Sequence, residues 1–75
     1  MTKIPRLSGK EVIKALSKVG FEIIRQKGSH VIMKKKTPDG IIATVVPNHK
    51  EIDIGTLLEI IRQVKLTRDE FINLL

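Results

Sequence analysis

A histidine that follows two turn residues and stands among lysines is the part of this chain best placed to do chemistry. His30 comes directly after Gly28-Ser29 and lies between Lys27 and the lysine run 34–36. An imidazole beside cationic positions suits a phosphate better than a metal ion. Histidine titrates at about pH 6.5, so it can take a proton from a ribose 2′-hydroxyl or give one to a leaving 5′-oxygen near neutral pH. The pattern predicts phosphodiester chemistry at His30.

The residues around His30 have roles that match this chemistry. Lysine side chains stabilise the charge of a phosphorane-like transition state. Strand alternation would place His30 and Lys34 on one face with their Cα atoms roughly 13 Å apart, a span that two long side chains can close on one phosphodiester. Gly28 would let the backbone approach a substrate, or would only supply the positive φ of a tight turn. The residues alone leave open a second interpretation, in which His30 is an exposed strand residue without a function.

A second histidine suggests a different kind of site. In an extended chain His49, Glu51 and Asp53 would share one side, which is a conceivable metal site of one imidazole and two carboxylates. In the alternative, Asp53 caps a helix, Glu51 is a solvated charge near that helix, and His49 ends a loop. We expect the alternative, and therefore no metal and no cofactor. Glycine-rich phosphate loops and a nucleophile-elbow motif are absent, so nucleotide hydrolysis and serine chemistry have no support.

The element that presents His30 is a predicted β-hairpin. Residues 21–26 are rich in β-branched side chains, residues 27–29 supply a turn, and residues 30–35 form the next strand. A second turn, Thr-Pro-Asp-Gly at residues 37–40, leads into a third strand over 41–46 that ends before a proline. The sequence therefore predicts a three-stranded antiparallel meander.

One helix is predicted before these strands. Ser8 and Glu11 have the spacing of a capping box, and Gly20 can adopt the left-handed conformation that ends a helix, so we expect a helix over about residues 9–19. Lysines spaced four apart would line its outward face, at Lys10, Lys14 and Lys18. The lysine stripe is either a solvated surface or a site for an anionic partner.

Two helices are predicted after the strands. Asp53 is placed to cap the first of them. Its apolar stripe would consist of Leu57, Ile60, Ile61 and Val64. Thr67 and Glu70 form another capping box, which opens a short last helix. Its inward side chains would be Phe71, Leu74 and Leu75. The order is α-β-β-β-α-α, and we expect an α+β fold that makes residues 1–75 one domain.

Length and charge narrow the possible functions. A chain of 75 residues has no room for a separate cofactor-binding half, and its net charge of +6 favours a polyanionic partner. Residues 1–36 hold ten basic and two acidic side chains, so the anion-facing surface should come from them. The absence of cysteine excludes a disulfide scaffold, a thiolate nucleophile and a Cys-ligated zinc site.

Other residue types are informative because they are scarce. No signal peptide and no long apolar run is present, so we expect a cytoplasmic protein that does not contact a membrane. The chain has no Trp or Tyr, and its two phenylalanines, Phe21 and Phe71, fall at positions that look buried. A stacking platform for single-stranded bases is therefore not expected. Recognition of nucleic acid would go through the sugar–phosphate backbone and would depend strongly on salt.

The motifs named so far recur in one order along the chain. They are Leu7-Ser8-Gly9-Lys10-Glu11-Val12, Gly20-Phe21, Gly28-Ser29-His30, Val46-Pro47-Asn48-His49, Gly55-Thr56-Leu57 and Ile60-Ile61. In this order and spacing the chain resembles the HicA toxin family, also called YcfA-like. The resemblance implies a small fold like a double-stranded-RNA-binding domain, α-β-β-β-α with a three-stranded antiparallel sheet, to which this chain adds a short C-terminal helix.

The resemblance also implies a function. Family members are mRNA interferases, the toxins of type II toxin–antitoxin pairs, and a HicB-like antitoxin neutralises them. The catalytic histidine of the family corresponds to His30 and its important glycine to Gly28. We therefore expect a metal-independent endoribonuclease that acts on mRNA, with His30 as general acid/base and Gly28 and Ser29 at the substrate. Phosphate would be bound by Lys27, Lys34 and Lys35.

Two other functions fit the same residues. The chain could be an RNA-binding module without catalysis, which would bind RNA and leave it intact. It could instead be only an interaction partner, whose lysine stripe docks an acidic protein, and it would then not retain RNA in a salt-dependent way.

Overall fold

The computed structural model describes residues 3–75 as an α+β fold, which confirms the predicted order of elements. The elements are α1 (Gly9–Ser17), β1 (Glu22–Lys27), β2 (His30–Thr37), β3 (Gly40–Pro47), α2 (Ile54–Gln63) and α3 (Arg68–Ile72). All of the peptide bonds described are trans. Within residues 3–75, no helix has the length and hydrophobicity that crossing a bilayer requires.

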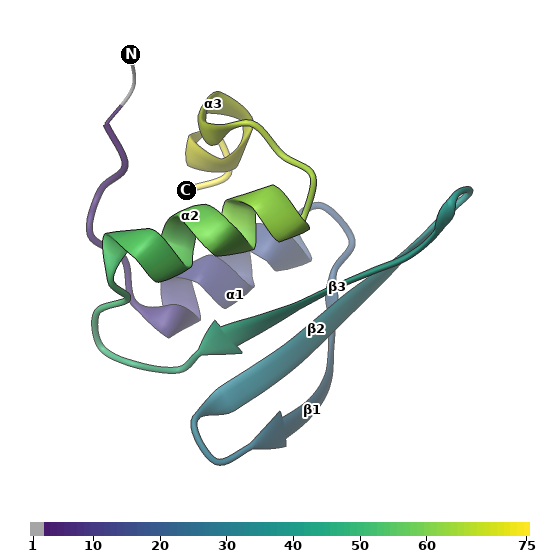
Figure 1. The fold of residues 1–75 in the computed structure, drawn as a ribbon, viewed down its shortest axis with the longest axis horizontal. Helices are drawn as coiled ribbons and strands as arrows, with labels where there is room; N and C mark the ends of the chain where they lie inside the picture. The colour runs from purple at the N-terminus through teal and green to yellow at the C-terminus, as the bar shows by residue number, and fades with distance from the viewer. Residues whose placement is uncertain (1–2) are drawn as a thin grey trace.

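The three strands form an antiparallel meander in the order β1-β2-β3. The helices all lie on one side of this sheet, with α1 and α2 next to each other and α3 on their far side (Figure 1). The other side of the sheet, which we call the open face, is not covered by any described element. Successive residues of a strand point to opposite faces of the sheet, so the side chains of β2 alternate between the covered face and the open face.

The core lies between the helices and the covered face. Val31 and Met33 of β2 are fully buried there, next to Thr44 and Val46 of β3. The predicted stripe of α2 is buried as expected, at Leu57, Ile60, Ile61 and Val64. Phe71 of α3 is buried against the same core. The expectation for Leu75 is wrong, because the chain passes the end of α3 before it can turn inward and Leu75 stays about half exposed.

The caps predicted from the sequence are present. Ser8 Oγ accepts from the Glu11 amide at 3.2 Å while the Glu11 carboxylate accepts from the Ser8 amide at 3.0 Å. Thr67 and Glu70 repeat this reciprocal pair at the start of α3. Helix α1 ends at Ser17, two residues earlier than predicted, and the chain then turns through Gly20 at φ +97°. Local capping chemistry therefore sets where these helices start and stop.

Candidate functional site

His30 is the first residue of β2 and lies on the open face. Its Cα partners are Lys27 of β1 on one side and Pro47 of β3 on the other. Val31 and Met33 are buried against the helices, so alternation turns His30 and Lys34 the other way, and both are exposed. The imidazole is therefore open to a polymeric ligand that approaches from outside.

The turn before His30 has a backbone conformation that favours glycine at one position. Gly28 and Ser29 join β1 to β2, and Gly28 has φ +60° at the first of these two positions, as in a type II′ hairpin turn. The Gln26 side-chain amide donates to the Gly28 carbonyl at 3.0 Å. A Cβ atom at Gly28 would meet nothing within 4 Å. The turn thus offers bare, accessible backbone directly beside the histidine.

The loop after β3 folds back onto this turn. The Asn48 amide donates to the Ser29 carbonyl at 2.6 Å, and the Gly9 amide of α1 donates to the His49 carbonyl at 2.9 Å. A Cβ atom on Gly9 would overlap the Pro47 carbonyl oxygen and lie 2.7 Å from the Asn48 Cα atom. Glycine at position 9 therefore lets α1 begin in contact with the loop, and three distant segments meet next to His30.

This convergence brings together basic residues that are far apart in the sequence. A hollow of about 290 Å³ beside the turn is lined by Ser8, Lys10, Asn48, His49 and Lys50. By sequence spacing Lys10 belongs to a helix stripe with two other lysines, and no motif includes Lys50. One sequence feature pointed to this loop, because the segment Pro47-Asn48-His49 is part of the pattern that resembles the family. Hydrophobic periodicity does not predict which part of the chain a loop contacts.

The lysines predicted to accompany His30 separate into two groups. Lys27 is its direct cross-strand partner, and Lys34 lies on the same face farther along β2. Lys35 points to the covered side, where its ammonium group lies 5.8 Å from the centre of the Phe21 ring and its aliphatic carbons pack near Gly20. The structure brings Lys27 to His30 and does not bring Lys35 there.

The conceivable metal site at His49, Glu51 and Asp53 does not form. Among residues 3–75, no group of three His, Asp or Glu side chains is close enough to hold a metal ion. Glu51 lies 3.8 Å from the guanidinium of Arg6. The carboxylate of Asp53 accepts from the Thr56 hydroxyl at 2.7 Å and from the Thr56 amide at 3.1 Å, and these bonds lower the pKa of Asp53. Asp53 is thus a helix cap, as the alternative expected.

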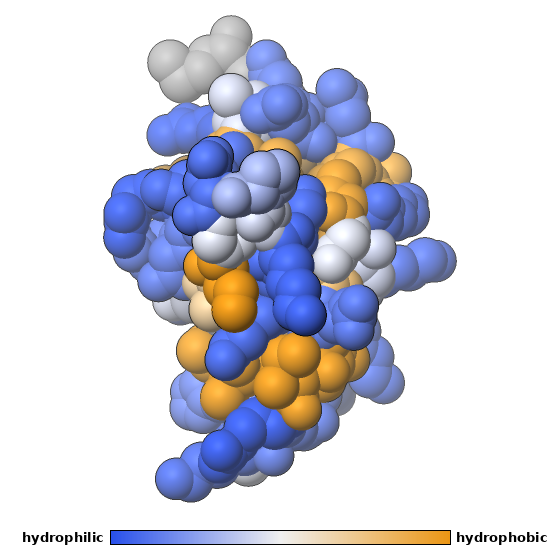
Figure 2. Space-filling view, turned by 90° about the vertical axis from the view of Figure 1, so that its right-hand side faces the viewer, coloured by the Kyte–Doolittle hydropathy of each residue, from blue (hydrophilic) through white to orange (hydrophobic). Residues whose placement is uncertain are grey.

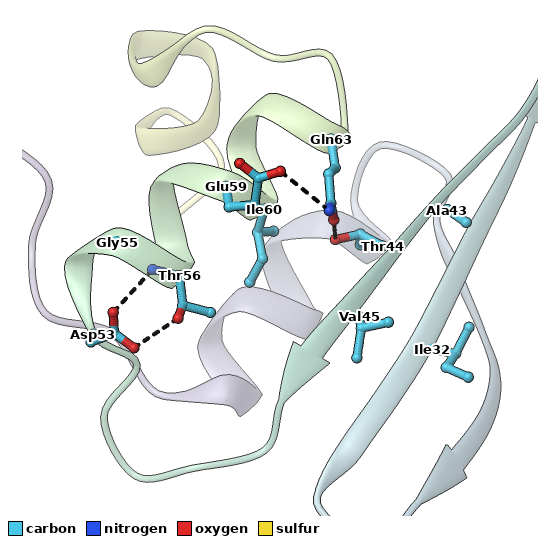
Figure 3. A pocket seen from close by; sticks show the side chains of 10 residues that line it. All are labelled: Ile32, Ala43, Thr44, Val45, Asp53, Gly55, Thr56, Glu59, Ile60 and Gln63. Atoms are coloured by element: carbon cyan, nitrogen blue, oxygen red, sulfur yellow. Dashed lines mark hydrogen bonds between the residues drawn. The ribbon is translucent and has the colours of Figure 1, made fainter.

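A hollow of about 530 Å³ lies elsewhere, between β3 and α2 (Figure 3). Its polar groups are engaged with one another: the Thr44 hydroxyl donates to the Gln63 side-chain oxygen at 2.7 Å, and Asp53 holds Thr56. Its second carboxylate, Glu59, binds Arg62. The lining includes no lysine, arginine or histidine, so this hollow does not suit an anionic ligand.

Comparison with known proteins gives one family. A family model described as "HicA toxin of bacterial toxin-antitoxin" matches residues 9–66, which run from the first residue of α1 to just beyond α2. The matched segment contains the first hairpin, His30 and the loop that folds back onto it. Helix α3 lies outside it. No curated protein matches the chain.

Proposed function

The chain belongs to the HicA toxin family, the toxins of bacterial toxin–antitoxin systems, and on that premise we propose that it is an endoribonuclease that cleaves mRNA with His30 as general acid/base. The observation that carries this proposal is the exposed imidazole beside a bare glycine turn, at the point where three basic segments converge. Family membership alone establishes a toxin. The residues around His30 support the chemistry by which it would act.

The proposed reaction is an internal transfer followed by strand release. His30 in its neutral form accepts the proton of a ribose 2′-hydroxyl, whose oxygen then attacks the adjacent phosphorus. The bond from phosphorus to the 5′-oxygen breaks, a 2′,3′-cyclic phosphate forms, and the 5′-oxygen leaves with a proton. One imidazole serves one proton transfer at a time, so water supplies the second proton at this exposed site. We therefore expect a slow enzyme.

In this proposal, the cations near the turn bind the phosphates of the RNA. Lys27 lies across the strand pair from His30, and Lys10 and Lys50 line the adjoining hollow. Ser29 contributes to the turn that the substrate would meet, and Lys34 extends the basic surface along β2. Because each lysine that neutralises a phosphate releases counterions, RNA affinity should fall steeply as salt increases.

The test uses the purified chain, a fluorescent RNA oligonucleotide and excess chelator. His30→Ala should slow cleavage by about 10²–10⁴-fold, the usual contribution of a general acid/base, and change RNA affinity by no more than a few fold. The matched control is His49→Ala, which removes an imidazole from the neighbouring loop and should retain most of the cleavage rate. If His30→Ala cleaves as fast as the unmodified chain, the assignment fails. Tight binding without any cleavage by the unmodified chain would instead indicate an RNA-binding module.

A further inference from the structure

We propose that two copies of this chain pair along the free edge of β3, which would join their two sheets into one. This interaction surface goes beyond the function proposed above and does not depend on it. β3 is the last strand of the sheet, and within residues 3–75 its strand partner is β2 alone. An edge strand presents unpaired amides and carbonyls, to which the backbone of another strand can bind.

The two edges of the sheet differ in how well they discourage such pairing. β1 carries three charged side chains, and its register with β2 shifts between Ile23 and Arg25. Charges and bulges of this kind are the usual protection of an edge strand. β3 has no charged residue, and it pairs with β2 along its whole length without a shift. Of the two edges, the β3 edge is therefore the one suited to a further strand.

The backbone groups that face this edge follow from the ladder between β2 and β3. In an antiparallel ladder, hydrogen-bonded pairs alternate with non-bonded pairs. The Asn48 amide donates to the Ser29 carbonyl opposite it, so every second residue before Asn48 bonds to β2. The residues between them turn their amides and carbonyls to the free edge, and these residues are Ile41, Ala43 and Val45. Within residues 3–75, no other segment binds these groups.

A second copy of β3 matches this edge in an antiparallel register centred on Ala43. Ala43 would pair with Ala43 of the second copy, and Ile41 with Val45 of the second copy, so outward amides meet outward carbonyls. The side chains of Ile41 and Val45 lie on the open face, 65% and 43% exposed. They would form an apolar cross-strand pair on each side of the centre. Figure 2, seen from the side of the β2–β3 turn, shows such apolar surface among hydrophilic side chains.

The hollow between β3 and α2 leaves room for the second copy on the covered side of the sheet (Figure 3). In the register centred on Ala43, Ile42 of the second copy lies opposite Thr44. Thr44 lines the hollow together with Ile60 of α2. Ile42 is only half-buried in a single chain, so pairing would remove more of its side chain from water.

Charge favours a second copy over RNA at this edge. Asp53 and Glu59 line the hollow without any basic residue, and their carboxylates would repel a phosphate backbone. The hairpin that the second copy would place there carries the lysine run 34–36. An acidic hollow and a basic hairpin in one chain are complementary when two copies are related by a two-fold axis. Because each copy has a net charge of +6, we expect a weak dimer that dissociates on dilution.

The test is sedimentation of the His30→Ala chain from micromolar to millimolar concentration, so that toxicity and RNA cleavage do not enter the result. This chain should show a monomer–dimer equilibrium. Val45→Lys puts a charge against Ile41 of the second copy and should weaken the dimer by roughly tenfold or more. Ala43→Pro removes the outward amide at the centre without breaking the ladder to β2, and it should have a similar effect.

The matched control is Ile24→Lys, which adds the same charge on the open face of β1, at an isoleucine that is 52% exposed. It should leave the equilibrium unchanged. Circular dichroism checks that each variant is folded. In the dimer, amide hydrogen exchange should slow at Ile41, Ala43 and Val45 and stay fast at the edge of β1, a measurement that needs no variant.

Three outcomes would overturn the proposal. The first is a chain that stays monomeric at millimolar concentration. The second is a dimer that Val45→Lys weakens no more than Ile24→Lys does, since another surface would then hold it together. The third is a dimer in which the amides of Ile41, Ala43 and Val45 exchange as fast as in the monomer. None of these results bears on cleavage at His30, which is measured separately.

Discussion

The two ends of β2 carry turns of the same size with very different surroundings. The first turn, Gly28-Ser29, and the second turn, Pro38-Asp39, each involve a glycine with positive φ, at Gly28 and Gly40, and at both a Cβ atom would meet empty space. At the second turn the Thr37 hydroxyl donates to the Gly40 carbonyl at 2.8 Å, no other segment of residues 3–75 is bonded to it, and it projects away from the helices (Figure 1).

The first turn differs because other segments reach it. The Asn48 amide is bonded to Ser29, and the start of α1 is bonded to the same loop. Turn geometry therefore does not make a site by itself. The first turn becomes a candidate site because a histidine follows it and because the loop bonded to it shares a hollow with the start of α1 that is lined by Lys10 and Lys50.

The largest expected effect comes from filling the empty space at the first turn. Gly28→Asn puts a side chain at a φ of +60°, which Asn accepts better than most other residues but with some strain, so the hairpin should form with reduced stability. Its side chain would occupy the approach to His30 and should slow RNA cleavage by about 100-fold, a typical result of a misplaced substrate. The measurement is cleavage rate together with circular dichroism. The matched control is Asp39→Asn, which puts the same amide on the second turn and should leave the rate unchanged. Full activity of Gly28→Asn would mean that the glycine serves only the turn.

The next largest expected effect is on folding stability, and it should be confined to the loop beside the first turn of β2. Gly9→Ala forces a Cβ atom against the Pro47 carbonyl and Asn48, and overpacking of this kind typically costs about 1–3 kcal/mol. In a domain of this size each 1 kcal/mol lowers Tm by about 4–8 °C. Amide exchange should rise at Asn48 and not at Gly40. Gly55→Ala is the control, since its Cβ would meet only a side-chain oxygen of Asp53 at 3.3 Å. Equal Tm values for the two variants would refute the close packing at Gly9.

A smaller effect concerns charge at the two ends. Lys27→Gln removes the cation paired with His30, and it should weaken RNA binding by a few fold and reduce the slope of log affinity against log salt by about one. Lys36→Gln removes the cation next to the second turn and should leave the slope unchanged. Fluorescence anisotropy at several salt concentrations measures both. Identical slopes for the two variants would mean that RNA follows the whole of β2.

The smallest effect is on acid stability. Hydrogen bonds from Thr56 lower the pKa of Asp53 in the folded state. The stability that this carboxylate contributes is present above the ordinary aspartate pKa of about 4, and it is lost as pH falls through the lower folded value. Asp53→Asn caps the helix without titrating. Its Tm should lie slightly below that of the unmodified chain at pH 7, and the gap should close towards pH 2. A gap that stays constant with pH would contradict this account.

Much of the fold was predictable because it depends on residues close together in the chain. The two capping boxes, the caps at Ser8, Asp53 and Thr67, and the glycines of the two hairpin turns are local signals of a few residues. Alternation predicted that His30 and Lys34 share a face. The errors lie at chain ends and at the ends of elements, as with Leu75 and the last residues of α1, where local preferences are weak.

The candidate site was only partly predictable. His30, Gly28 and Lys27 are neighbours in sequence, so the motif names them together. Lys35 is next to Lys34 in the chain but points to the other side of the sheet, since neighbouring strand residues alternate. Lys10 and Lys50 are far from each other in sequence and share one hollow only because the loop is bonded to α1 and to the turn before His30.

The sequence by itself determined the elements, their order and the histidine, because caps, turns and alternation act over a few residues. Only the tertiary structure decided which segments meet at the turn before that histidine and which apolar side chains remain in water. The reason is that helix packing covers one face of a three-stranded sheet, and with no further layer the other face stays bare. Ile41 and Val45 are thus left in water by the fold, beside residues that sequence spacing does not connect with them.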